Sequence, residues 1–361
     1  MAEIRIQNLV KIFPGNTRAV DDVSIHVADG EFLVLLGPSG CGKTTTLRCV
    51  AGLERQTSGD IYIGKRLVNA MPPADRDIAF VFQFYALYPH LSAYDNIAFP
   101  LKAARLPKAE VDQRVHQVAE MLKINHLLDR RPKRLSSGEQ QRVALGRAIV
   151  RRPQVFLLDE PLTNMDASLR ADMRVELKHL QQELGVTTLY VTHDQTEAMV
   201  MGQKVAVMDA GKLQQVGTPL EVYNHPATLF VAGFIGSPPM NILDVTLEAG
   251  PSLVNSDGAF RLPVDTALAE KCPPRTPLKM GIRSEDLHIT SDPTAGDMPA
   301  EVYVVEPLGD ETIYSLRFAG NHLMLAKAPP TLDLKVGDKV GVRFERSRLH
   351  IFDVATGKAL R

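Results

Sequence analysis

The chain has no tryptophan and only three cysteines among its 361 residues. Cys41, Cys49 and Cys272 are odd in number and lack metal-ligand spacing, so we expect reduced thiols and neither a disulfide framework nor a cysteine-based metal site. An excess of charge is also missing, because 41 basic and 42 acidic residues give a formal net charge of −1. This balance argues against a protein built to wrap nucleic acid.

Long hydrophobic runs are absent as well. No apolar stretch approaches the roughly 20 residues needed to cross a bilayer, and the first seven residues lack the apolar core of a signal peptide. We therefore expect a protein that is made and kept in the cytoplasm. The hydrophobic content of 45% and the charged content of 23% are those of a soluble chain long enough for two or three domains.

The most informative segment that is present is 37–45, which matches G-x-x-x-x-G-K-T. The apolar run 31–36 before it is bounded by glycines and predicts a buried strand, and residues 43–51 after it have helical spacing. A strand, a glycine loop and a helix in this order form the context of a phosphate-binding loop.

The residue types in this loop suit a bound phosphate. Gly37, Gly40 and Gly42 allow a tight turn whose backbone N–H groups converge on phosphate oxygens at a helix N-terminus. Lys43 supplies a cation, and Thr44 offers a hydroxyl to Mg²⁺. The predicted nucleotide-binding loop consists of Gly37, Pro38, Ser39, Gly40, Cys41, Gly42, Lys43, Thr44 and Thr45.

Aromatic and amide side chains elsewhere in this half have two interpretations each. Phe13 lies in a turn-rich loop between two predicted strands, either as a core aromatic or as the face on which a nucleotide base stacks. Gln83 ends the apolar strand 77–83, where its amide either closes a loop or reaches Mg²⁺ or its water. The apolar and aromatic segment Phe84–Leu91 is either core or a docking surface.

Paired carboxylates end the predicted buried strand 154–160. Burial of Asp159 and Glu160 is costly unless a cation or a proton transfer occupies them. Asp159 can therefore hold Mg²⁺ while Glu160 orients or deprotonates a water. In the alternative interpretation, one of the acids only caps a helix that begins at Pro161.

Two further polar groups stand at element ends. Ser136 and Ser137 precede a predicted helix, either as ordinary N-cap residues or as donors to a terminal phosphate. His193 follows the predicted strand 187–191 on the edge where open α/β sheets bind their ligands. We therefore expect His193 to be functional.

The pattern changes near residue 236, at the proline-marked junction 234–240. Short strands are predicted near residues 279–282, 301–305, 312–318, 322–326 and 341–346. They indicate a small all-β, OB-like barrel, without a basic strip interleaved with aromatics for nucleic acid. The predicted domains are thus 1–235 and 236–361.

The ordered motifs resemble an ATP-binding-cassette (ABC) ATPase across residues 1–235. The resemblance implies an α/β P-loop NTPase domain with a helical subdomain at about 88–152, followed by a C-terminal regulatory domain. It makes Phe13 the base-stacking aromatic, Gln83 the Q-loop residue and Glu160 and His193 the catalytic pair. It also assigns Asp159 to the metal and Asp166 to the D-loop. The signature motif is 135–139, so Ser136, Ser137 and Gly138 contact ATP.

Runs 193–199, 215–223 and 234–241 resemble the importer branch that includes maltose-type ATPases for sugars and glycerol phosphate. This resemblance implies ATP and Mg²⁺ as cofactors, a head-to-tail ATPase dimer and two permease subunits docked near Phe84–Leu91. An extracytoplasmic solute-binding protein would act indirectly, with the chain peripheral on the cytoplasmic face of the inner membrane. Polyamine, iron or sulfate uptake is the first alternative, and a soluble nucleic-acid ATPase is the second.

The signature departs from the family's usual Leu-Ser-Gly-Gly-Gln. Ser137 replaces the first glycine, so its Cβ could crowd a backbone that approaches the nucleotide. Glu139 replaces the glutamine and adds a negative charge. We expect these departures to affect the rate of hydrolysis more than the function itself.

Overall fold

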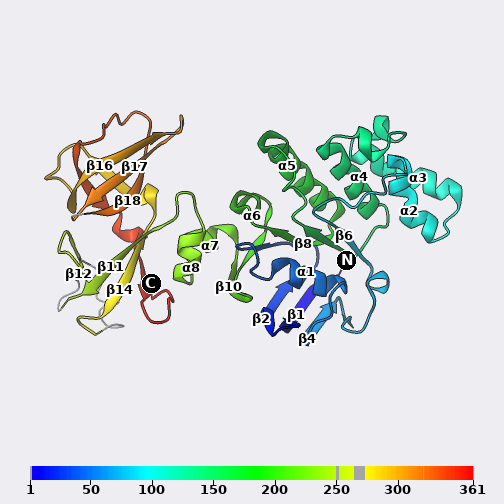
Figure 1. Ribbon diagram of the computed structural model, residues 1–361, viewed down its shortest axis with the longest axis horizontal. Helices are drawn as coiled ribbons and strands as arrows, with labels where there is room; N and C mark the ends of the chain where they lie inside the picture. The colour runs from blue at the N-terminus through cyan, green and yellow to red at the C-terminus, as the bar shows by residue number, and fades with distance from the viewer. Residues whose placement is uncertain (1, 249–251, 264–272, 320, 361) are drawn as a thin grey trace. The chain divides into compact units, whose positions relative to one another are not determined.

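The computed structural model describes residues 2–248, 252–263, 273–319 and 321–360, which divide into two units at residues 220 and 221 (Figure 1). The division falls before the predicted boundary at 235. Tyr223 and Ile235 explain the difference, because both accept hydrogen bonds from Arg283 of the second unit. Each unit is described by itself below.

A six-stranded sheet forms the centre of the first unit, in the order β10-β9-β3-β8-β7-β6. All neighbours are parallel except β10 and β9. The strands are β3 (Phe32–Leu36), β6 (Ile78–Val81), β7 (Val155–Asp159), β8 (Thr187–Thr192), β9 (Lys204–Asp209) and β10 (Lys212–Gly217). Parallel strands bring their carboxyl ends to one edge, the edge at which the sequence predicted His193.

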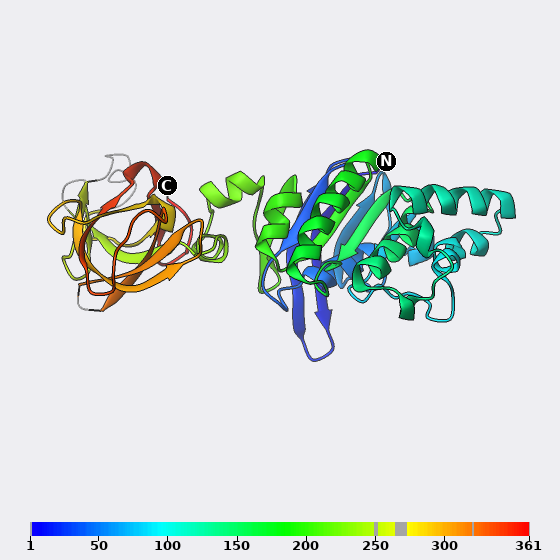
Figure 2. The same ribbon diagram turned by 90° about the horizontal axis from the view of Figure 1, so that it is seen from above.

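An antiparallel sheet of order β2-β1-β4-β5 accompanies the first one. Its strands are β1 (Ile4–Phe13), β2 (Thr17–Val27), β4 (Ser58–Ile63) and β5 (Arg66–Leu67). The β1–β2 hairpin, drawn in blue, projects from the body of the unit (Figure 2). The prediction that Phe13 lies in a loop is wrong, because Phe13 is the last residue of β1 and pairs with Thr17.

Helices cover both faces of the parallel sheet. They are α1 (Lys43–Ala51), α2 (Ala93–Ala103), α3 (Lys108–Met121), α4 (Ser137–Ile149), α5 (Ala167–Leu184) and α6 (Gln195–Met201). Leu33 and Leu35 of β3 share one core with Leu47 and Val50 of α1. Strand side chains alternate between faces, so Phe32 lies on the opposite face, beside Leu177 and Leu180 of α5.

The helical subdomain predicted at about 88–152 contains α2, α3 and α4. Val111, Val115 and Val118 of α3 are buried, as their predicted stripe requires. The longest helix, α5, begins where the side chain of Asp166 accepts a hydrogen bond from the Leu169 N–H. Asp166 is therefore a helix N-cap within this chain.

The second unit begins with α8 (Leu229–Phe234), while α7 (Pro219–Asn224) spans the division. It contains two antiparallel five-stranded sheets, β13-β12-β11-β14-β20 and β15-β19-β16-β17-β18. The strands are β11 (Asn241–Leu247), β12 (Ser252–Asn255), β13 (Arg261–Pro263), β14 (Pro277–Ile282), β15 (Leu287–Thr290), β16 (Met298–Pro307), β17 (Thr312–Phe318), β18 (His322–Ala328), β19 (Lys339–Phe344) and β20 (His350–Asp353).

One apolar cluster between these sheets draws residues from both, including Leu253, Met280, Leu316 and Val342. The five predicted strands correspond to β14, β16, β17, β18 and β19, and the all-β prediction is confirmed. The sequence missed the seven-residue strand β11 and shorter strands such as β13 and β15, which hold three and four residues.

Arg283 joins the chain entering this unit to its β-sheets. Its side chain is buried (3% exposed), and the guanidinium donates to the Tyr223 carbonyl (2.6 Å) and the Ile235 carbonyl (2.7 Å). The guanidinium carbon also lies 3.6 Å from the centroid of the Tyr223 ring. A buried carbonyl, that of Ile235, and a partly buried one, that of Tyr223, thus bind one side chain.

Arg283→Ala is expected to lower the free energy of unfolding of the second unit by about 3 kcal/mol, because an unpaired buried carbonyl costs roughly 1–3 kcal/mol. Calorimetry and circular dichroism of the full chain would measure the change. Arg343→Ala, which removes an exposed arginine of β19, is the matched control. Equal unfolding temperatures for the two variants would contradict the argument.

Two remaining sequence predictions concern cysteines and membrane helices. Cys41 and Cys49 are buried free thiols, and burial raises the pKa of Cys49 to about 11. Cys272 lies outside the described residues. Within the described ranges, no helix is long and apolar enough to cross a membrane.

Candidate functional site

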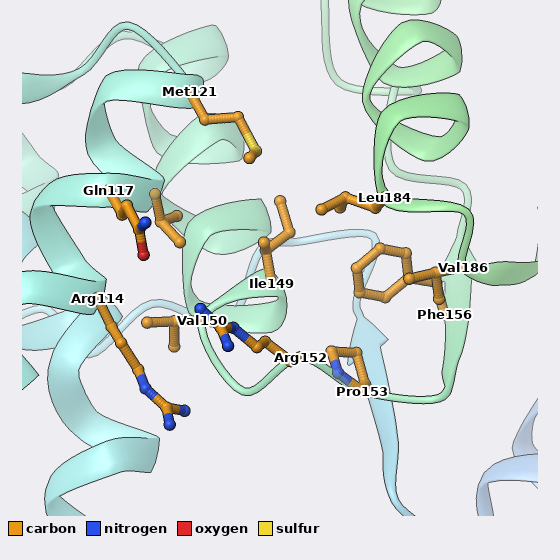
Figure 3. Close-up of a pocket in the computed structure, with 11 residues that line it drawn as sticks. Arg114, Gln117, Met121, Ile149, Val150, Arg152, Pro153, Phe156, Leu184 and Val186 are labelled. Carbon is orange, nitrogen blue, oxygen red and sulfur yellow. The ribbon is translucent and has the colours of Figure 1, made fainter. Parts of the chain in front are cut away.

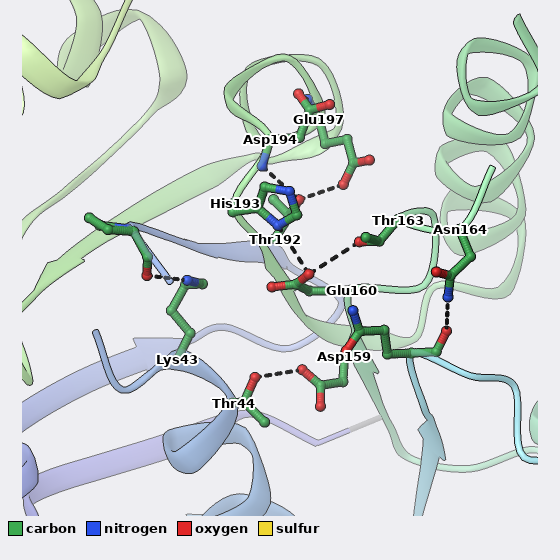
Figure 4. Close-up of polar contacts among 12 residues, drawn as sticks. Lys43, Thr44, Asp159, Glu160, Thr163, Asn164, Thr192, His193, Asp194 and Glu197 are labelled. Atoms are coloured by element: carbon green, nitrogen blue, oxygen red, sulfur yellow. Dashed lines mark hydrogen bonds and ion pairs between the residues drawn. The ribbon is translucent and has the colours of Figure 1, made fainter. Parts of the chain in front are cut away.

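The candidate site forms at the carboxyl edge of the parallel sheet. Leu36 of β3 pairs with Thr192 of β8, and Asp159 of β7 pairs with Val191. The residues that follow these pairs therefore emerge at one level. In Figure 4, the side chains of Lys43, Thr44, Asp159, Glu160 and His193 lie around one region although they are distant in sequence.

The glycine loop wraps its own lysine. Lys43 is 4% exposed, and its Nζ donates to the carbonyl oxygens of Gly37 and Pro38, both at 2.8 Å. Gly42 is the N-cap of α1 and has φ 104°, a value that side chains with a Cβ rarely adopt. The start of α1 and the Lys43 ammonium group thus belong to one glycine loop, an arrangement suited to an anion.

Two oxygen groups stand beside this loop. The Thr44 hydroxyl donates to an Asp159 carboxylate oxygen at 2.9 Å. Burial raises the pKa of Asp159, while the hydrogen bond from Thr44 and nearby cations oppose the rise. A hydroxyl and a carboxylate are hard oxygen ligands of the type Mg²⁺ takes. Among the described residues, no three His, Cys, Asp or Glu side chains gather to hold a metal.

Glu160 and His193 meet beside Asp159. Glu160 has φ 45°, a left-handed conformation that is strained for a residue with a Cβ and is common at functional sites. A carboxylate oxygen of Glu160 lies 3.0 Å from His193 Nδ1 and accepts a hydrogen bond from the Thr163 hydroxyl at 3.1 Å. The predicted carboxylate and histidine are thus brought together.

Gln83 reaches the same edge from β6, two residues after the end of that strand. Its carbonyl accepts a hydrogen bond from Asn164 Nδ2 at 2.9 Å. Asn164 belongs to the segment that follows Glu160, so the backbone at Gln83 is tied to the acidic end of β7.

The other predicted nucleotide contacts belong to different parts of the unit. Phe13 is the last residue of β1, just before the turn of the projecting hairpin. The Nζ of Lys11 lies 4.6 Å from the centroid of the Phe13 ring. Ser136 and Gly138 line a separate hollow of about 230 Å³ with Lys123, His126 and other side chains. Within the described part of the chain, the Ser136 side chain bonds to Glu139 and not to the glycine loop. Within the described part of one chain, the predicted ATP-binding residues are therefore not all gathered at the glycine loop.

A second hollow, of about 340 Å³, lies between α3, the α4–β7 connection and the end of α5 (Figure 3). Its walls are mostly apolar, with Arg114 and Arg152 among the lining residues. None of the site residues predicted from the sequence lines it. No residue of the glycine loop is among those that line this hollow.

Known proteins share both units of this chain. Residues 20–163 match the family model of the ABC transporter, 236–287 that of the MalK OB fold domain, and 280–352 that of the TOBE domain. The chain is 52% identical over 373 residues to the trehalose/maltose import ATP-binding protein MalK of Thermococcus litoralis, with all of both chains covered. This chain belongs to the ABC transporter family.

Two other comparisons support this family membership. The sn-glycerol-3-phosphate import ATP-binding protein UgpC of Cupriavidus pinatubonensis is 46% identical over 372 residues, again with all of both chains covered. The dimeric post-hydrolysis structure of the ATP-binding cassette MJ0796 bound to ADP and Pi is 29% identical with a TM-score of 0.55, and the match covers 60% of this chain and 98% of that one. The first unit is an ABC ATPase domain, as the sequence predicted, and the second is its OB and TOBE region.

The signature of this ABC ATPase departs from the family without disturbing the helix. Ser137 is the first residue of α4, and its φ is not among the positive values in the described chain, so its Cβ causes no backbone strain. The Glu139 carboxylate accepts a hydrogen bond from the Ser136 N–H at 2.7 Å, which completes a capping box. That bond is the main cause of the lowered pKa of Glu139. The carboxylate that Glu139 adds is therefore bound by the backbone at the start of its own helix.

Sequence reasoning about the cassette missed several supporting residues. Thr163 and Asn164 bind Glu160 and Gln83, as described above, and their place just after the acid pair was the available signal. Glu197 had no such signal. It is buried and accepts hydrogen bonds from the Tyr190 hydroxyl (2.8 Å) and the Thr192 hydroxyl (2.6 Å), and burial raises its pKa. This network holds the turn that carries His193.

Proposed function

We propose that this chain is the ATP-hydrolysing subunit of an importer that takes up a sugar, an oligosaccharide or a glycerol phosphate. The observation that carries the proposal is similarity along the whole chain to import ATP-binding proteins. The similarity includes the OB and TOBE region as well as the cassette. Conversely, the near-neutral charge gives little support to a nucleic-acid ATPase.

The phosphates of ATP would bind at the glycine loop. Its N–H groups at the start of α1 would donate to phosphate oxygens, and Lys43 would leave the carbonyls of Gly37 and Pro38 for a phosphate. Phe13 would stack on the base. Thr44, Asp159 and Gln83 would hold Mg²⁺, which when bound offsets the negative charge that develops on the phosphates.

Glu160 would act as the general base. Its carboxylate is held by the Thr163 hydroxyl and lies beside His193, so it can accept a proton from a water aligned with the γ-phosphate. His193 would orient this carboxylate and donate toward the γ-phosphate. A positioned base typically accelerates such a step by about 10²–10⁴-fold.

A second copy of the chain would complete the site. Ser136, Ser137 and Gly138 form the N-terminus of α4, and this hydrogen-bond donor surface lies apart from the glycine loop of its own chain. A head-to-tail dimer would place each signature helix against the ATP of its partner. Asp166 would then lie at the dimer contact as well as capping α5.

The permease dock would be the segment Phe84–Leu91. The Phe84 side chain is 76% exposed, and an adjacent hollow of about 300 Å³ is lined by Phe82, Tyr88, Phe99 and other side chains. Exposed apolar groups beside a hollow suit a short helix from each of two permease subunits. The chain would thus be peripheral on the cytoplasmic face of the membrane, and the extracytoplasmic solute-binding protein would act through the permease.

The test is purification of the intact assembly from native membranes through a tag on this chain. The ATPase rate would be followed as candidate solutes and their binding proteins are added. We expect two permease subunits to copurify, and we expect stimulation by a sugar, an oligosaccharide or a glycerol phosphate. Stimulation only by a polyamine, iron or sulfate would overturn the substrate class, and copurified nucleic acid without permeases would overturn the importer assignment.

A further inference from the structure

The permease dock is built on a backbone conformation that the chain would not keep by itself. Tyr85 and Ala86 are consecutive residues with φ of 58° and 48°, in the left-handed region that residues with a Cβ rarely occupy. This conformation buries Tyr85 while Phe84, its neighbour, points into solvent. Contacts from outside the segment must therefore hold it.

Arg147 of α4 supplies the contacts to Tyr85 and Ala86, while buried Asn96 of α2 binds the backbone of Tyr88 further along the segment. The Nη1 of Arg147 donates to the Ala86 carbonyl at 2.7 Å, and its Nη2 donates to the Tyr85 carbonyl at 2.8 Å. The guanidinium carbon also lies 5.5 Å from the centroid of the Tyr88 ring. One planar fork thus binds both left-handed residues through successive carbonyls, a geometry that a lysine cannot reproduce.

The same helix carries the signature residues at its other end. α4 runs without interruption from Ser137 to Ile149 and begins with a capping box, so its two ends move together. The segment is also fixed upstream, where Asn164 binds the Gln83 carbonyl. The dock is therefore held at its start by the segment that follows Glu160, at Tyr85 and Ala86 by the signature helix, and at its end by Asn96 of α2.

We propose that Arg147 is a positioning residue that couples the signature helix to the permease dock at Phe84–Leu91. The inference rests on the dimer and the dock of the proposed function. When α4 is drawn onto the ATP of a partner chain, Arg147 carries that displacement to the two carbonyls and hence to the docked permease helix. Arg147 itself contacts neither nucleotide nor reacting atoms.

The test compares Arg147→Ala and Arg147→Lys with the control Arg114→Ala in the full importer reconstituted in proteoliposomes. The lysine keeps the charge and the aliphatic stem, which protects folding, but lacks the fork. The control removes a surface ion pair with Glu110 in the same helical subdomain. We expect both Arg147 variants to lower the ratio of solute-stimulated to basal ATPase by about tenfold, a range typical of residues that carry coupling.

Two readouts separate coupling from general damage. The KM for ATP and the basal rate of the isolated subunit are expected to stay within about twofold of wild type, because Arg147 lies outside the nucleotide site. Amide hydrogen exchange at residues 84–91 is expected to become about tenfold faster in Arg147→Ala. The Arg114→Ala control should change neither readout.

Two results would overturn the inference. The first is full solute stimulation in both Arg147 variants while wild type is also stimulated. The second is unchanged exchange at residues 84–91 in Arg147→Ala. A wild-type subunit that assembles with permeases but responds to no sugar, oligosaccharide or glycerol phosphate would instead refute the proposed substrate class.

Discussion

Glu160→Gln is expected to lower the rate of ATP hydrolysis by about 100-fold or more, because glutamine cannot accept the proton of the attacking water. Glutamine keeps the size of the side chain and an oxygen acceptor for the Thr163 hydroxyl, so ATP should still bind. The bound ATP should then persist between two chains. Steady-state phosphate release and size-exclusion chromatography with MgATP would measure the two effects.

The matched control for this variant is Glu197→Gln, which changes a buried glutamate near His193 that accepts hydrogen bonds from the Tyr190 and Thr192 hydroxyls. It should lower the rate far less, because the amide oxygen of glutamine can still accept the hydrogen bonds from Tyr190 and Thr192 that hold the turn of His193. A Glu160→Gln variant that stays monomeric in saturating MgATP would contradict the head-to-tail dimer. One that retains the wild-type rate would remove Glu160 from its proposed role.

Gly42→Ala is expected to weaken MgATP binding by about 100-fold, which is about 2.8 kcal/mol. A Cβ at this position would lie 2.3 Å from the Ala19 carbonyl oxygen, and Gly42 has φ +104°. Both conflicts can be relieved only by moving the backbone that begins α1. The N–H groups that are expected to bind phosphate would move with it. Isothermal titration calorimetry with a non-hydrolysable ATP analogue would measure the loss.

Gly185→Ala is the control for backbone strain. Gly185 also has a left-handed φ, +61°, but a Cβ there would meet nothing within 4 Å. Because Gly185 ends α5, this variant should lose about 1 kcal/mol of stability and bind MgATP normally. Equal affinities for the two alanine variants would show that the packing of Gly42 against Ala19 does not shape the site.

Much of the fold and of the site could be predicted because the signals are local. The glycine loop, the apolar strand before it and the acids after β7 depend on residue type and short-range spacing, which fix the strand–loop–helix order. His193 could be placed because parallel strands end at one edge. The β1–β2 hairpin was predicted less well. The turn-rich sequence around Phe13 indicated a loop that includes this residue, whereas only residues 14–16 separate the two strands.

Contacts between distant segments could not be predicted in the same way. Asn164 and Gln83 are far apart in sequence, as are Arg147 and Ala86, yet each pair is joined by a hydrogen bond. Nothing in the local pattern of either partner identifies the other. The short strands of the second unit were missed for a related reason, because three or four residues carry too little alternation to stand out.

The sequence by itself determined that this chain has a glycine loop between a strand and a helix, an acid pair at the end of a buried strand and a β-rich second part, because these follow from residue chemistry at fixed spacing. Only the tertiary structure decided that Lys43 is held by its own loop, that Glu160 faces His193, and that α4 reaches from the signature residues to the proposed dock. The physical reason is that hydrogen bonds and burial are set by chain packing, which brings together groups that the linear order keeps apart.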